Sequence, residues 1–79
     1  MASSVSTIEI DARGMMCPMP IVELAKARRS SVAGTEIVVI ADDLAFGSDV
    51  VAWCRCTHNE LLALERVGHD YHARIRIGG

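Results

Sequence analysis

The chain has 79 residues, which is enough for one small domain with a single hydrophobic core. Hydrophobic residues make up 51% of it, but only Phe46, Trp53 and Tyr71 are aromatic, so the core should be aliphatic. Eight basic and ten acidic side chains give a formal net charge of −2. This balance argues against direct binding of nucleic acid, which needs a basic face. We expect one domain over residues 1–79, with residues 1–4 disordered.

The N-terminal residues have neither the basic segment nor the apolar run of a signal peptide, and no apolar stretch is long enough to cross a bilayer. We therefore expect a cytoplasmic monomer that does not enter the membrane. Cysteines in the cytoplasm are kept reduced, so Cys17, Cys54 and Cys56 should be free thiols. Their odd number agrees with this prediction.

The first elements in chain order are a strand over residues 5–10, whose alternate residues point inward, and a loop over residues 11–14. An amphipathic helix is predicted from Pro18 to about Ser31. Basic side chains in its second half suit the negative end of the helix dipole and need no nucleic acid to explain them. The residues expected to form its buried stripe are Ile21, Leu24 and Ala25.

The junction between this strand and this helix holds the run Gly14-Met15-Met16-Cys17-Pro18-Met19-Pro20. Cys17 should lie in or near the N-cap position, where free backbone N–H groups and the helix dipole favour a thiolate. Pro18 suits the first helical position, and Pro20 still lies in the first turn. Gly14 permits a backbone conformation closed to other residues. This stretch therefore predicts a presented, reactive cysteine; the alternative is a small buried residue without chemistry.

The second half of the chain begins with a nearly continuous apolar run, Glu36 to Ala41, which is typical of a central strand. A second helix follows residues 46–49, capped by Ser48 or Asp43, with an inner face of Val50, Trp53, Cys54 and Thr57. Residues 60–67 and 71–77 form a hairpin. The predicted fold is an α/β (α+β) two-layer sandwich of order βαβαββ. Its first two strands are parallel, and both helices cover one face of a four-stranded mixed sheet.

Two further clusters suggest metal binding at first sight. Asp42 and Asp43 supply too few ligands for a metal and are common residue types at helix starts. Cys54 and Cys56 are two apart on a helix, so they point to different sides and cannot share a zinc ion. We expect Cys54 in the core, Cys56 exposed, and neither a metal nor a cofactor in the protein.

The sequence resembles the small TusA/SirA-like sulfur carriers. Residues 11–20 match the signature D-x-x-G-x-x-C-P-x-P of that family, and Val38-Val39-Ile40-Ala41-Asp42-Asp43 is similar to its second strand and the acidic pair after it. Trp53-Cys54 and Glu60-Leu61-Leu62 fall where the family has its second helix and third strand. The resemblance covers nearly the whole chain, from Ile8 to Ile77.

This resemblance implies a carrier that accepts sulfur as a persulfide on Cys17 and passes it to a partner protein. Arg13, Gly14, Pro18, Met19 and Pro20 would support that site. The implied partners are a donor, such as a cysteine desulfurase or a rhodanese-like protein, and an acceptor protein. The implied pathways are tRNA thiolation, cofactor maturation and sulfur oxidation. The implied activity is that of a sulfurtransferase-like carrier, which acts through a cysteine persulfide intermediate.

One residue departs from the tRNA-thiolation type, which often has an acidic residue between the two prolines where this chain has Met19. The choice of pathway therefore stays open. Two other functions also stay open: a regulatory or adaptor domain with an inert Cys17, and a thiol-redox protein that cycles through sulfenic acid.

The basic residues are spread along the chain, and we interpret Arg74 and Arg76 as the solvated side of an edge strand. Arg13 could instead dock a partner protein.

Overall fold

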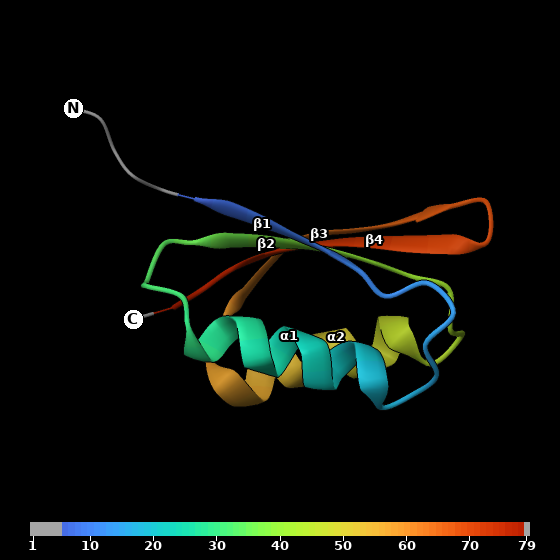
Figure 1. Ribbon diagram of the computed structural model, residues 1–79, viewed down its shortest axis with the longest axis horizontal. Helices are drawn as coiled ribbons and strands as arrows, with labels where there is room; N and C mark the ends of the chain where they lie inside the picture. The colour runs from blue at the N-terminus through green and yellow to red at the C-terminus, as the bar shows by residue number, and fades with distance from the viewer. Residues whose placement is uncertain (1–5, 79) are drawn as a thin grey trace.

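The computed structural model describes residues 6–78, so the disorder predicted for residues 1–4 lies outside the described part, as does Val5 of the predicted first strand. The described chain has the predicted order βαβαββ (Figure 1). Its elements are β1 (Thr7–Asp11), α1 (Met19–Arg29), β2 (Glu36–Ala41), α2 (Phe46–Thr57), β3 (Glu60–Val67) and β4 (Asp70–Arg76).

Both helices lie against one face of a four-stranded sheet, as Figure 1 shows and as the sequence predicted. The strand order is β1-β2-β4-β3, with β1 parallel to β2 and β4 antiparallel to both of its neighbours. The crossover through α1 returns the chain in the same direction, which makes the first pair parallel. The interpretation of the last strand as an edge is wrong, because β4 lies between β2 and β3, and β3 forms the edge.

The core lies between the sheet and the helices. Alternate residues of the two central strands point into it, because side chains along a strand alternate between its faces. The helices add one buried residue per turn, and Cys54 is only 3% exposed, as predicted. The buried residues of these four elements are Ile37, Val39 and Ala41 in β2, Ala73 and Ile75 in β4, Pro20 and Leu24 in α1, and Phe46, Val50 and Cys54 in α2.

The helix boundaries differ from the prediction. Helix α1 is shorter at both ends, and α2 begins at Phe46, before the predicted cap Ser48. Its N-cap is Ala45, without a side-chain cap, so both predicted caps, Ser48 and Asp43, are wrong. The Ser48 hydroxyl donates to the carbonyl of Ala45 instead. Burial of Phe46 explains the early start, since packing of an apolar face stabilises a helix more than capping does. Neither helix of residues 6–78 is long and apolar enough to span a membrane.

The face of the sheet opposite the helices carries paired charges. Arg74 lies 2.6 Å from Glu36 on β2, and Arg76 lies 3.3 Å from Glu60 on β3. On the other face, toward the helices, the guanidinium of Arg66 covers the ring of Tyr71 at 4.8 Å, and that ring also lies beside Phe46 of α2. These arginines are engaged within the sheet, which leaves less positive charge for a phosphate backbone.

Candidate functional site

The loop that carries Cys17 lies beside the segment that follows β2. Parallel strands end at the same edge of a sheet, so the segments after β1 and β2 emerge next to each other, at the right-hand end of Figure 1. Ala12, which follows β1, is fully buried, and its N–H donates to the carbonyl of Ile40 at 2.7 Å. This bond fixes the base of the loop to β2.

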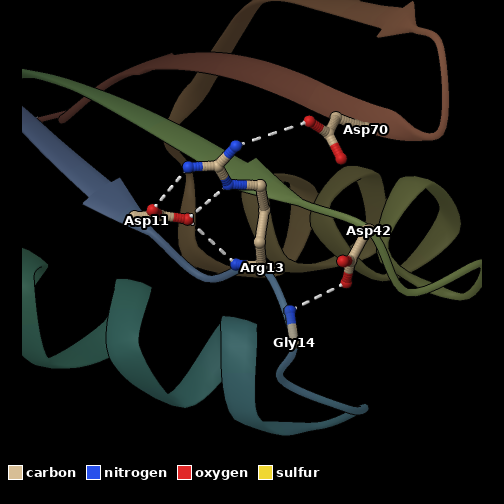
Figure 2. A network of polar contacts seen from close by, with 5 residues as sticks. All are labelled: Asp11, Arg13, Gly14, Asp42 and Asp70. Carbon is tan, nitrogen blue, oxygen red and sulfur yellow. Dashed lines mark hydrogen bonds and ion pairs between the residues drawn. The ribbon is translucent and has the colours of Figure 1, made fainter.

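Gly14 is the point at which the loop turns, and it has the predicted special conformation. Its φ is +84°, a left-handed value that other residues adopt at a cost. A Cβ there would meet nothing within 4 Å, so the requirement for glycine comes from the backbone angle and not from space. The Gly14 N–H donates to Asp42 Oδ1 at 3.0 Å (Figure 2), so the side chain of Asp42 holds the turn.

Arg13 belongs to a charged cluster at the end of the strands. Figure 2 shows its side chain between Asp11 and Asp70. Its Nε and Nη2 donate to the two oxygens of Asp11 at 2.9 and 2.8 Å, and Asp70 lies 3.9 Å from Nη1. The side-chain hydrogen bonds from Arg13, followed by the bond from its backbone N–H, lower the pKa of Asp11 to about 2. The Arg13 guanidinium thus braces the base of the loop.

Cys17 is exposed and lies one residue before the N-cap, near that position as the sequence predicted, whereas Pro18 was expected at the first helical position. Pro18 is the N-cap of α1, so Cys17 precedes the cap, and the Cys17–Pro18 peptide bond is cis. The first turn offers the sulfur little help, because Pro18 and Pro20 have no N–H. The N–H of Met19 donates to Met16 at 2.8 Å and that of Ile21 to Pro18 at 3.1 Å. The donors expected to favour a thiolate are absent or already engaged.

The sulfur of Cys17 contacts a carboxylate instead. Its thiol donates to Oδ2 of Asp49 at 2.9 Å, across to the first turns of α2. This hydrogen bond, with desolvation and the negative charges of Asp49 and Asp43, raises the pKa of Cys17 above its ordinary value. The predicted thiolate is therefore wrong for the isolated protein, in which Cys17 is a hydrogen-bonded thiol.

The surroundings of Cys17 are open and apolar. Met16 is 74% exposed and Met19 is 44% exposed, while Pro20 is buried below them. Flexible methionine side chains adapt to different partner surfaces. The rim beside the sulfur is thus suited to contact with another protein.

The other two cysteines lie where the sequence placed them, with Cys54 in the core and Cys56 exposed. Burial raises the pKa of the Cys54 thiol to about 11. The described residues contain no group of three or more His, Cys, Asp or Glu side chains arranged to hold a metal ion. Cys54 is therefore a packing residue in this structure, far from thiolate character.

Asp42 and Asp49 hold the loop, and the sequence did not reveal either role. From the sequence alone, Asp42 is an ordinary acid at a helix start or in a turn, and Asp49 is part of the lead into α2. The available signal was topological: after two parallel strands, polar residues at their carboxyl ends lie close together and commonly form sites. That rule selects Asp42 directly and the start of α2 indirectly.

The comparisons with known proteins agree with this architecture. A family model described as sulfurtransferase TusA matches residues 8–77. The chain belongs to the TusA family. It is 36% identical over 74 residues to YrkF of Bacillus subtilis (strain 168), which is named as a proposed sulfur carrier protein; the match covers 94% of this chain and 40% of YrkF. The TusA-family chain thus spans less than half the length of this curated relative.

A solved structure extends the likeness to three dimensions. The crystal structure of a SirA-like protein from Desulfitobacterium hafniense matches with a TM-score of 0.78 at 25% identity, over 91% of this chain and 99% of that one. The predicted TusA/SirA-like membership and the predicted fold are both confirmed. The TusA-family domain therefore presents its cysteine on an open rim, beside an acidic helix start.

Proposed function

We propose that this protein is a sulfur carrier that holds sulfur as a persulfide on Cys17. It accepts the sulfur from a donor protein and passes it to an acceptor protein. The observation that carries the proposal is the position of Cys17, an exposed cysteine on an apolar rim at the carboxyl ends of two parallel strands. Membership of the TusA family supports it.

The loading reaction is a transfer without net oxidation. The sulfur of Cys17 attacks the outer sulfur of a donor persulfide, the donor's S–S bond breaks, and the donor cysteine leaves as a thiolate that takes up the proton lost by Cys17. The products are a Cys17 persulfide and a free donor thiol. A donor that lowers the negative charge around Cys17 on docking would make this attack faster, because the isolated thiol is held protonated.

The shape of the protein favours transfer between proteins over turnover of a small molecule. A hollow of about 240 Å³ lies on the sheet face opposite the helices, and its lining includes Ala63, Glu65 and Arg74. None of its lining residues belongs to the Cys17 loop. The exposed methionines beside Cys17 form an open surface, which a partner can cover and so exclude water.

The donor is a protein with a labile persulfide, such as a cysteine desulfurase or a rhodanese-like domain, and the acceptor is a protein cysteine. The pathway that the carrier serves, whether tRNA thiolation, cofactor maturation or sulfur oxidation, depends on which donor and acceptor it binds. A redox cycle within the chain is disfavoured, because its resolving cysteine would have to be Cys54, which is buried in the core, or Cys56 on the same helix.

Intact mass after incubation with polysulfide tests the proposal. Wild type and Cys56→Ser should both gain the mass of one sulfur, which dithiothreitol removes. Cys17→Ser should gain none. Equal loading of Cys17→Ser, or no loading of wild type, would refute the proposal.

A further inference from the structure

The carboxylate of Asp49 is the polar group that contacts Cys17. It comes from α2, 32 residues further along the chain, and its Oδ2 lies 2.9 Å from the sulfur. A residue near the start of a helix is a favourable place for an acid, so dipole compensation explains Asp49 in part. It does not explain why the carboxylate is turned toward a thiol in another segment.

Accepting sulfur and giving it up favour opposite charge states of the sulfur on Cys17. A sulfur that attacks a donor works best as an anion. A persulfide that gives up its outer sulfur must be attacked there by an acceptor thiolate, and a negative charge on the outer sulfur repels that attack. A persulfide is more acidic than a thiol, so without help it would be anionic at neutral pH.

We propose that Asp49 is a positioning residue that keeps the sulfur on Cys17 protonated, as a thiol before loading and as a hydropersulfide after it, and so prepares the outer sulfur for handover. This inference rests on the proposed function. An S–S bond is about 2 Å long, so the added sulfur stays within reach of the same carboxylate after a rotation about the side chain.

Every bond, electron pair and proton is accounted for in the transfer to the acceptor. The acceptor thiolate attacks the outer sulfur of the Cys17 hydropersulfide, the S–S bond breaks, and the electron pair of that bond remains on the Cys17 sulfur. The proton released when the acceptor thiol ionised ends on Cys17, which again donates to Asp49. No oxidant or reductant is consumed.

The charges that face the sulfur all act in one direction. Asp49 on α2 and Asp43 in the segment before it are the two charged residues of the described chain that shift the pKa of Cys17, and both raise it. Arg13, the basic residue nearest in sequence, is turned to Asp11 and Asp70. The α1 start adds no free N–H, because prolines occupy two of its first positions.

The experiment compares wild type with Asp49→Asn, with the rescue variant Asp49→Glu and with Glu65→Gln, a matched loss of charge on the exposed edge strand. The first measurement is alkylation of Cys17 by iodoacetamide as a function of pH, followed by peptide mass. Asp49→Asn should react severalfold faster at pH 7 and have a lower midpoint, while the other two variants should resemble wild type.

The second measurement is release of sulfur from polysulfide-loaded protein to glutathione at pH 7. Because the acceptor is the same throughout, the ratio of the variant's release rate to that of wild type reports only the difference between the two carrier proteins. Loaded Asp49→Asn should release sulfur severalfold more slowly, and Asp49→Glu should restore most of the rate. An unchanged alkylation midpoint or an unchanged release rate in Asp49→Asn overturns the inference. Wild type that does not load on Cys17 overturns the proposed function, while the alkylation profile still decides whether Asp49 controls the thiol.

Discussion

Replacing Cys54 by serine should lower stability without abolishing sulfur loading. The side chain is 3% exposed and packs with Phe46 and Val50 in the core. A serine hydroxyl placed there without a partner costs about 1–3 kcal/mol. On a helix the hydroxyl can donate to the carbonyl four residues earlier, that of Val50, which moves the expected cost toward the lower end of that range.

The size of this loss matters because the domain is small. At about 0.05–0.15 kcal/mol per residue, the free energy of unfolding is of the order of 4–12 kcal/mol, so the substitution removes a large share. Cys54→Ala avoids the buried hydroxyl and should cost about 1 kcal/mol, near the value for one buried methylene group. For a domain of this size each kcal/mol lowers Tm by about 4–8 °C.

Thermal and urea unfolding followed by circular dichroism give the measurement, with Cys56→Ser as the exposed control. That control should lie within about 0.5 kcal/mol of wild type. All three variants should still load sulfur on Cys17. A Cys54→Ser variant that is as stable as wild type and yet no longer passes sulfur on would contradict the packing role and assign Cys54 a relay role.

Gly14→Ala should cost roughly 1–2 kcal/mol, because alanine must adopt the left-handed φ of +84°, and urea unfolding will show it; wild-type stability would mean that the loop has another conformation. The side-chain carboxyl of Asp11 should titrate near pH 2 by NMR, so the stability from its pair with Arg13, present above the unfolded pKa of about 4, is lost only as pH falls toward 2. Arg13→Gln should move that midpoint up toward the ordinary value, and an unmoved midpoint would contradict the pairing. The isolated protein should bind tRNA weakly in a gel-shift titration at physiological salt, and tight, saturable binding would contradict this prediction.

Patterns within single segments predicted much of the fold. The alternation of Tyr71, Ala73, Ile75 and Ile77 predicted the last strand, and the apolar run at residues 36–41 predicted a central one. Both predictions work because buried positions are apolar and recur at the spacing that the secondary structure sets. The pairing order was less visible. Alternation does not say which strand of a hairpin joins the rest of the sheet, which is why the predicted edge position of β4 is wrong.

The chemistry at Cys17 depended on contacts that local patterns do not contain. The motif correctly marked an exposed cysteine at a helix start, but the prediction counted helix N–H groups that Pro18 and Pro20 remove. The decisive neighbour, Asp49, is brought to the sulfur only when both helices pack on the same face of the sheet. Its effect has the opposite sign to that of the helix dipole, which is why the predicted thiolate is wrong.

The proposed carriage of sulfur between proteins on Cys17 can be followed directly with an isotope. The most direct test supplies a cysteine desulfurase with cysteine labelled by a heavy sulfur isotope, adds this protein, and maps the label by peptide mass. The label should appear as a persulfide on Cys17 and be lost to dithiothreitol. Label on Cys54 or Cys56, or equal labelling of Cys17→Ser, would contradict the claim.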